Sequence, residues 1–293
     1  MMRADPAMGA NPFSVRTALA LVVFGSCLFV LLLWMIGNGF AQGSSNDGGS
    51  HADGRGLNGF AAFSELLERR GHPTHHTRTK AAQGDGGLLI LTPSASAKAD
   101  DIEAAIKRHR KIGPTIVILP KWQASPIRPK TQALIKAKAG WTVLHGAHSP
   151  HWADDLSSFG RLDVRVDAIA RGKWAGFGHA GRLPGDVQQT LGSGSVATLV
   201  GDRQRQTLIG YRDDGSANAS LRKFDLVSRT DDEEFTSSAY PLVIVAEPDL
   251  FNNYGMADQA RAMLALSVVA ALGVSPQTPV QFDLTLAGIE RDA

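Results

Sequence analysis

The sequence predicts an α/β fold in which helices flank a mostly parallel sheet, with an antiparallel β insertion and one N-terminal transmembrane helix. Three observations lead to this prediction. Short, continuously apolar runs, typical of buried parallel strands, alternate with helical patterns. One segment, about residues 161–235, breaks that alternation. Residues 17–36 are apolar and uncharged, long enough at 1.5 Å per residue to cross the roughly 30 Å hydrocarbon core of a bilayer.

The apolar segment also predicts the topology of the chain. Arg3 and Arg16 precede it, and no Lys or Arg follows until Arg55. The positive-inside rule therefore places residues 1–16 in the cytoplasm and the main domain on the far side of the membrane. A cleaved signal peptide is the alternative, because residues 39–41 offer small residues at the positions that a peptidase reads. Signal-peptide cores run only about 7–15 residues, which favours retention.

Composition excludes several classes of function. The chain of 293 residues has 30 basic and 28 acidic residues, a balance that gives no electrostatic footprint for nucleic acid. Its one cysteine, Cys27, lies inside the predicted span. The main domain therefore has neither disulfides nor thiol chemistry. We expect no cofactor, and the lipid bilayer, reached through residues 17–37, is the one partner that the chain itself implies.

The folded domain is expected to begin with a helix. From Asn58 the apolar residues recur at helical spacing, Gly71 offers a stop, and Pro73 follows as it does after many helix ends. Residues 38–56, rich in Gly, Ser and Asp, precede this helix and are too polar to fold by themselves. We therefore assign a flexible linker to them and an α/β domain to residues 57–293.

A strand, a helix and a second strand come next. Residues 88–91 and 115–119 are continuously apolar, like strands buried on both faces of a parallel sheet. Between them, Asp100 and Asp101 favour the positive N-terminal end of a helix, and the basic residues 107–111 favour its negative C-terminal end. That basic run also suits an anionic partner, but it lacks interleaved aromatic residues, and a solvated helix end explains it.

A third helix and strand complete this half of the domain. Residues 131–138 have a helical pattern that ends at Gly140, and residues 141–144 follow as a short apolar run. Because the links are short, the sequence predicts that residues 141–144 form a third strand of the same parallel sheet.

Residues 161–235 have strand patterns without helices between them. Residues 161–168 alternate apolar and charged positions, and residues 196–200 and 207–211 are separated by a polar turn, as in a hairpin. The sequence predicts either an antiparallel insertion or an extension of the sheet.

The α/β pattern returns near the C-terminus. Residues 241–246 form another apolar strand, and residues 280–286 form the last one. Between them, residues 256–272 form a helix that is apolar on most sides yet much too short to span a bilayer. We expect this helix to be buried against the sheet.

Four segments share a resemblance to one bacterial family. They are the helix of residues 58–71, the strand with the sequence LLILTPS, residues 242–266 and residues 279–288. Together they resemble the domain of unknown function 4350 family. The resemblance implies a membrane-anchored, flavodoxin-like or class I glutamine-amidotransferase-like α/β domain, with no established activity. It further implies a membrane complex with a MoxR-type ATPase and von Willebrand-like proteins. With the predicted topology, it also implies a location at the bacterial inner membrane with a periplasmic main domain. Members commonly carry a second span after the position of Gly288, which leaves open a shorter or truncated form.

The first candidate site lies at the ends of two predicted strands. Open α/β sheets bind ligands at the carboxyl ends of their strands, where carboxylate and amide side chains suit a cation or a polar ligand. The alternative is that these side chains build turns and cap the next helix. The candidate ligand-binding residues are Thr92, Ser94, Glu247, Asp249, Asn252 and Asn253.

A second candidate is a metal site in the loop after residues 141–144. Imidazoles three residues apart with a nearby carboxylate suit zinc or another transition metal. Gly146 and Pro150 keep the rings off a single helix face, so surface or structural histidines are the alternative. The candidate ligands are His145, His148, His151 and Asp154.

The sequence thus predicts a membrane-anchored α/β binding or scaffold domain that does not catalyse. Ser193 lies in a Gly-Ser-Gly-Ser run that precedes a strand, whereas a nucleophile elbow lies between a strand and a helix. The glutamine-amidotransferases that the domain resembles use a catalytic cysteine, and residues 57–293 contain no cysteine. The alternative function is a metal-dependent hydrolase that uses residues 145–155 or residues 247–253.

Overall fold

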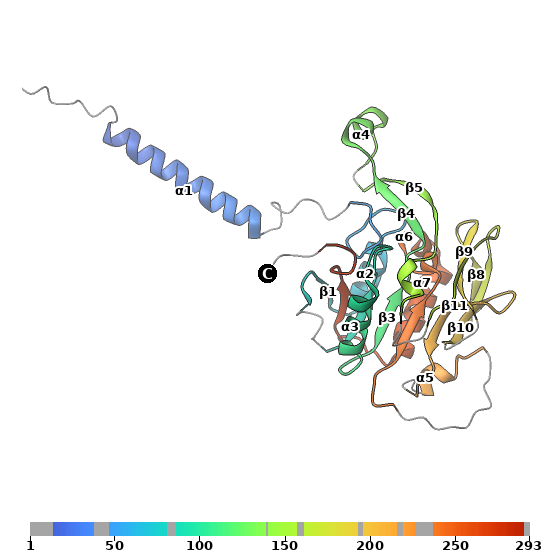
Figure 1. Cartoon of the computed structure of the whole chain (residues 1–293). Coiled ribbons are helices and arrows are strands. Elements are labelled where there is room, and N and C mark those ends of the chain that lie inside the picture. Colours follow the sequence, from blue (N-terminus) through green and yellow to red (C-terminus); the bar gives the residue numbers. More distant parts are fainter. Residues whose placement is uncertain are drawn as a thin grey trace, which may run out of the picture. The chain divides into compact units, whose positions relative to one another are not determined.

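The computed structural model divides into two compact units, Met1–Ser45 and Asn46–Ala293, which we describe separately (Figure 1). The described residues are 14–37, 47–80, 86–138, 140–156, 161–192, 196–215, 219–226 and 237–289. The first unit contains helix α1, Val15–Gly37. By length and composition α1 can cross a membrane. A signal sequence near an N-terminus has the same length and composition. The proposed cleavage positions, residues 39–41, lie outside the described residues.

The second unit is built on an eleven-stranded mixed sheet, counted over the described residues. The strand order along the sheet is β1-β13-β2-β3-β12-β11-β10-β7-β8, and β9 pairs with β11 and with β6. Five strands are parallel: β1 Thr74–Thr77, β13 Val280–Asp283, β2 Leu88–Leu91, β3 Thr115–Ile118 and β12 Leu242–Val245. Six are antiparallel: β6 Val164–Ala168, β7 Lys173–Gly176, β8 His179–Arg182, β9 Val187–Leu191, β10 Val196–Asp202 and β11 Thr207–Arg212.

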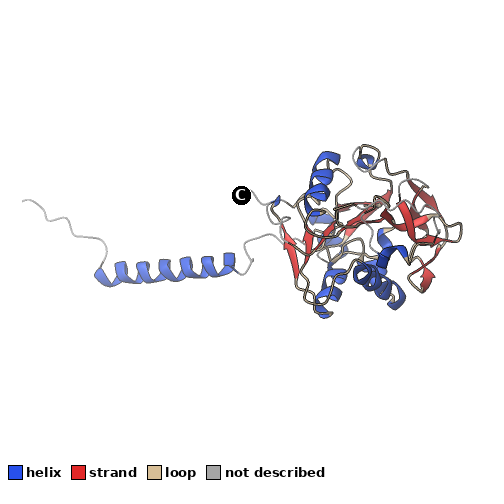
Figure 2. Cartoon of the chain, turned by 90° about the horizontal axis from the view of Figure 1, so that it is seen from below, coloured by secondary structure: helices blue, strands red, loops and turns tan. Residues whose placement is uncertain are grey.

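Helices cover both faces of the parallel strands (Figure 2). Because side chains alternate along a strand, Leu88 and Ile90 of β2 belong to one buried cluster, and Leu89 and Leu91 belong to another. The first cluster includes residues of α2, Ala61–Arg69, and of α7, Gln259–Ala271; the second includes residues of α3, Ala99–His109. The continuous apolar runs are explained by this burial on both faces.

The predicted α/β class is confirmed, and residues 161–235 contribute antiparallel strands that extend the same sheet through the β11–β12 pair. The finer expectation of a flavodoxin-like sheet is not met by the strand order. A flavodoxin-like sheet runs 2-1-3-4-5, whereas the five parallel strands here, numbered along the chain, run 1-5-2-3-4. The last strand, β13, enters between the first two, an arrangement that local sequence patterns do not encode.

The strand predicted at residues 141–144 is placed wrongly by the sequence analysis. The observed strand, β5 Thr142–Ala147, pairs antiparallel with β4, Trp122–Pro126, in a separate two-stranded sheet. Helix α4, Pro129–Ile135, joins the two strands. We call residues 122–147 the arm, because Figure 1 shows it projecting from the rest of this unit with α4 at its tip. A short apolar run is compatible with a ribbon as well as with a parallel strand, so periodicity could not separate the two.

The predicted linker of residues 38–56 is too long. Residues 38–46 lie outside the described residues, but residues 47–56 pack onto the folded unit, where His51 is 2% exposed and Ala52 is 1% exposed. Asp53 pairs with Arg78 at 2.9 Å and also contacts His76. The segment is polar, and its order depends on partners far along the chain, which composition does not reveal.

The helix predicted at about residues 256–272 is observed as α7, Gln259–Ala271. It begins after Asp258, whose side chain accepts a hydrogen bond from the backbone of Arg261 at 3.2 Å, and the short helix α6, Asn253–Met256, precedes it. Aspartate is a favoured residue at this capping position. The remaining short helices are η2 His151–Ala153, α5 Ala219–Arg222 and η3 Pro248–Leu250.

Candidate functional site

Three charged side chains lie together beyond the carboxyl ends of two neighbouring parallel strands. Lys121 follows β3, and Glu247 and Asp249 follow β12, which pairs with β3. All three side chains are 0% exposed. The structure therefore places charge at the edge of the sheet where ligands commonly bind, but it removes that charge from solvent.

The ammonium group of Lys121 uses all its donors inside the protein. It donates to Oε1 of Glu247 at 2.6 Å, to Oδ2 of Asp249 at 2.6 Å and to the backbone oxygen of Val187 at 3.0 Å. A lysine side chain has three donor hydrogens, so none remains for a ligand.

The two carboxylates are also satisfied within the protein. Glu247 accepts further hydrogen bonds from the backbone of Asp249 at 2.9 Å and from the backbone of Gln189 at 2.7 Å. Oδ1 of Asp249 accepts from Nε1 of Trp122 at 2.8 Å and from Nδ2 of Asn252 at 2.6 Å. We call these residues, with Lys121, the buried Lys121 cluster. It is a closed network that holds Trp122, the first residue of the arm, to the sheet.

Burial and charge pairing shift the pKa values in this cluster. Burial raises the pKa of Glu247 from 4.5 to about 7, against the opposing effect of the nearby ammonium. Burial also opposes the charged form of Lys121, but the carboxylates of Glu247 and Asp249 outweigh it and raise the pKa of that ammonium. Lys121 is therefore charged at neutral pH.

The structure brings three of the candidate ligand-binding residues, Glu247, Asp249 and Asn252, into this cluster. Asn252 also caps α6, since its Oδ1 accepts from the backbone of Gly255 at 2.9 Å. Asn253 lies apart: its amide donates to the backbone oxygens of Gly54 at 2.8 Å and Gly56 at 2.6 Å. These contacts support the alternative that such side chains build turns and caps.

Thr92 and Ser94 follow β2 and, in the described part of the chain, do not hydrogen-bond to the Lys121 cluster. Thr92 is 2% exposed, and its hydroxyl has no hydrogen-bond partner among the described residues. The Ser94 hydroxyl lies 3.2 Å from that of Ser96, and the Ser94 backbone oxygen accepts from Trp152 at 3.0 Å. The ligand-binding set of the sequence analysis is thus divided among three places.

The four candidate metal ligands do not form a common site. Nε2 of His145 lies 2.7 Å from the hydroxyl of Ser125 across the arm, while His148 and His151 are exposed. Asp154 accepts from Arg161 at 2.9 Å. Over the described residues, no three His, Cys, Asp or Glu side chains gather closely enough to hold a metal ion.

The two remaining candidates from the sequence are the basic run of residues 107–111 and Ser193. In the basic run of residues 107–111, Arg110 binds both carboxylate oxygens of Asp214, at 2.9 and 3.1 Å, and also donates to the backbone oxygen of Tyr240. That arginine ties α3 to the antiparallel part of the sheet. Ser193 lies outside the described residues.

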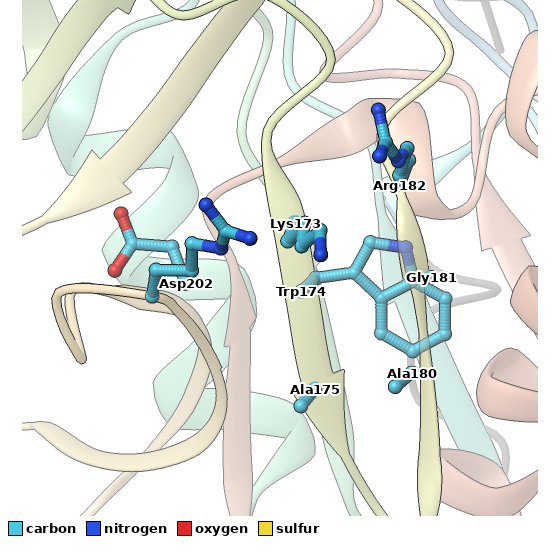
Figure 3. A pocket seen from close by; sticks show the side chains of 8 residues that line it. Lys173, Trp174, Ala175, Ala180, Gly181, Arg182 and Asp202 are labelled. Carbon is cyan, nitrogen blue, oxygen red and sulfur yellow. The ribbon is translucent and has the colours of Figure 1, made fainter.

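A pocket of about 470 Å³ lies on the antiparallel part of the sheet (Figure 3). Lys173 and Arg182 lie on the neighbouring strands β7 and β8, and Arg203 lies in the turn after β10. A second pocket shares these three cations and adds Arg171. We call Arg171, Lys173, Arg182 and Arg203 the basic pocket; within the described residues none of them has an ion-pair partner. Figure 3 also shows the indole of Trp174 lying against Gly181, where it forms an apolar floor.

Two cations of the basic pocket lie opposite each other on neighbouring strands and repel each other. Lys173 and Arg182 are direct cross-strand partners in the β7–β8 pair, and like charges directly opposite each other destabilise a sheet. Asp202, the acidic residue of the pocket, accepts from Gln188 at 2.8 Å and from the backbones of Gln204 and Gln206 at 2.8 Å. These hydrogen bonds hold the Asp202 carboxylate in place. With four cations and one carboxylate, the pocket keeps an excess of positive charge.

The sequence analysis missed both Lys121 and the basic pocket. Lys121 had a local signal, because it directly follows a continuous apolar strand and a proline. The basic pocket had no such signal, since its four cations come from two turns and two strands of the antiparallel segment.

The comparisons with known proteins add no assignment. A scan against protein-family models, a search of curated proteins and a search of solved structures each found no match to this chain.

Proposed function

We propose that this chain is a membrane-anchored, non-catalytic binding protein whose α/β domain takes an anionic ligand in the basic pocket. The observation that carries the proposal is the contrast between two polar regions. At the carboxyl edge of the sheet, Lys121 and its carboxylates are buried and saturated with internal hydrogen bonds. On the antiparallel strands, Lys173 and Arg182 face each other without a counter-ion in the described structure. An anion between them would relieve their repulsion.

The chemistry of the pocket suggests the class of ligand. Gln188 lines the pocket beside Arg171, and its Oε1 is buried without a hydrogen-bond partner among the described residues. An acceptor of this kind favours a ligand that carries a hydroxyl or amide donor near its anionic group. A phosphorylated sugar or polyol has both features.

The proposed location rests on the sequence and on α1. The helix is long and apolar enough to span a bilayer, and the basic residues Arg3 and Arg16 precede it. The positive-inside rule then favours a cytoplasmic N-terminus and an extracytoplasmic domain. A complex with a MoxR-type ATPase rests on the family resemblance alone. Co-purification of such an ATPase from detergent extracts would support it, and recovery of the chain alone would speak against it.

A binding experiment tests the proposed ligand class. The full chain in zwitterionic nanodiscs is titrated with glucose 1-phosphate, with glucose as the neutral control, and tryptophan fluorescence or calorimetry reports binding. We expect saturable binding of the phosphate only, and a loss of about tenfold or more in affinity for Lys173→Gln with Arg182→Gln, because charge-assisted hydrogen bonds contribute about 1.5–3 kcal/mol each.

Arg128→Gln, a change of an exposed arginine in the arm, is the matched control and should bind as the wild type does. Equal binding of glucose and its phosphate, or an affinity that the two pocket changes leave intact, would contradict the proposal.

A further inference from the structure

The arm exposes an unusual amount of apolar surface. Leu134 is 82% exposed, and Ile135 and Trp141 are each 54% exposed. Val143 and Leu144 of β5 are 47% and 50% exposed. Isolated apolar side chains are common on protein surfaces, but five of them within residues 134–144 of one projecting element indicate an interaction site.

Both faces of the arm carry exposed apolar side chains. Val143 and Leu144 are consecutive residues of a strand, so their side chains point to opposite faces of the ribbon, and both are exposed. A two-stranded ribbon is marginally stable in water by itself. The arm would therefore gain stability from an apolar environment that surrounds its tip.

The charge of the arm indicates what that environment is. Residues 122–147 contain no Asp or Glu, and their four Lys and Arg side chains are all exposed: Arg128, Lys130, Lys136 and Lys138. Exposed apolar residues with a tryptophan and a purely basic rim are typical of segments that enter an anionic lipid surface. A protein partner with an acidic groove would attract the arm in the same way. The position of the arm is therefore needed to distinguish a membrane from a protein partner.

The position of the arm favours the membrane. Gly48, near the start of the folded unit, lies against the α4 end of the ribbon, since a Cβ on Gly48 would collide with Gly140 and Thr142, and Thr142 pairs with Pro126 just before α4. Ten residues, 38–47, separate Gly48 from the end of α1. A fully extended chain covers at most about 3.6 Å per residue, so this connection is at most about 40 Å long, and a short connection of this kind favours the membrane as the surface that the α4 end of the ribbon meets.

The base of the arm is held firmly enough to direct its tip. Trp122, at the start of β4, donates to Asp249 at 2.8 Å, and the backbone of His148, just past β5, donates to Lys121 at 2.9 Å. Both ends of the ribbon are thus fixed to the buried Lys121 cluster. That cluster serves as a clamp for the arm rather than as a place of chemistry.

We propose that the tip of the arm, with Leu134, Ile135 and Trp141, inserts into the anionic surface of the bilayer that anchors the chain. The basic side chains of the arm then contact lipid phosphates. The inference rests on the proposed membrane anchoring and gives the domain a second, reversible attachment that fixes its orientation on the membrane.

The experiment places an environment-sensitive fluorophore at the tip of the arm. In a Cys27→Ala chain, Ala133→Cys carries an NBD label, and Ala104→Cys, at an exposed alanine of α3, is the matched control. Each full-length protein is assembled into nanodiscs of phosphatidylcholine with or without phosphatidylglycerol, and spin-labelled lipid serves as the quencher.

We expect a blue shift and lipid quenching at position 133 in the anionic nanodiscs, decreasing with salt, and none at position 104. Neutralising Lys130, Lys136 and Lys138 with glutamine should lower the insertion equilibrium about fivefold per residue, because each basic side chain near an anionic surface contributes about 1 kcal/mol. Leu134→Ser with Ile135→Ser should also abolish the shift. These side chains are exposed, so unchanged thermal unfolding would show that the variants still fold.

Each contrary result has a distinct meaning. A chain that enters the nanodiscs but keeps a water-like, unquenched label at position 133 overturns the arm proposal and leaves the anchoring intact. A chain that fails to enter any nanodisc overturns the anchoring itself. A label that is shielded without lipid quenching, and only when two copies share a disc, would show that a second copy covers the arm, which also overturns the proposal.

Discussion

Removing the cation from the buried Lys121 cluster should cause a large loss of stability. The change Lys121→Met keeps most of the side-chain volume but leaves the carboxylates of Glu247 and Asp249, both 0% exposed, without their counter-charge. Breaking a buried ion pair in this way costs about 3–5 kcal/mol. In a body of this size 1 kcal/mol moves the midpoint by roughly 2–4 °C, so the melting temperature should fall by roughly 6–20 °C.

Thermal unfolding of the full chain in detergent, followed by near-ultraviolet circular dichroism, measures this loss. Lys130→Met removes an exposed lysine of the arm and is the matched control, with an expected change within about 0.5 kcal/mol. If Lys121→Met unfolds within 1–2 °C of the wild type, the ammonium does not hold the network together, and the clamp of the arm has another origin.

A double-mutant cycle makes the same prediction more specific. In a Glu247→Gln background one of the two buried charges is already absent, so Lys121→Met should cost less than it does in the wild type. Residues in direct contact usually show coupling of roughly 0.5–3 kcal/mol. Additive effects would show that the 2.6 Å contact between these groups contributes no net stability.

Two further predictions concern pH and the N-terminal segment. Because burial raises the pKa of Glu247 from 4.5 to about 7, the folded protein keeps a proton that the unfolded chain releases between these values. The stability from this group is therefore full below about pH 4.5 and lost as the pH rises to about 7. The melting temperature of the wild type relative to Glu247→Gln should fall across that range, and a constant difference would contradict it. Asn253→Ala removes the hydrogen bonds to Gly54 and Gly56, each contributing about 0.5–1.5 kcal/mol. Limited proteolysis should then cut residues 47–56 faster, whereas an unchanged pattern would mean that other contacts hold this segment.

Four of the five parallel strands were predictable because they are buried on both faces, whereas β1 is partly exposed and was not predicted. The runs at residues 88–91 and 115–119 are apolar without alternation, and the structure places β2 and β3 there. The break at residues 161–235 likewise predicted the antiparallel strands. Residues 141–144 have the same apolar character, yet they belong to the arm, because burial against neighbours rather than composition decides which sheet a strand joins.

The candidate site was predictable only in part. Glu247 and Asp249 were found because they follow an apolar strand, but their partner Lys121 lies on a different loop, 126 and 128 residues away along the chain. The histidines at residues 145, 148 and 151 are close in sequence and yet form no common site among the described residues. Spacing along the chain indicates chemistry reliably only where one regular element carries all the residues.

The sequence by itself determined an apolar helix long enough for a bilayer, an α/β class and the absence of thiol chemistry in the domain, because each depends on composition or on short periodic patterns. Only the tertiary structure decided that β13 enters between β1 and β2, that Lys121 neutralises two buried carboxylates, and that four cations gather into the basic pocket. These features depend on contacts between residues far apart in the chain. Long-range pairing is fixed by how apolar faces pack and how buried charges find partners, which no local window of sequence contains.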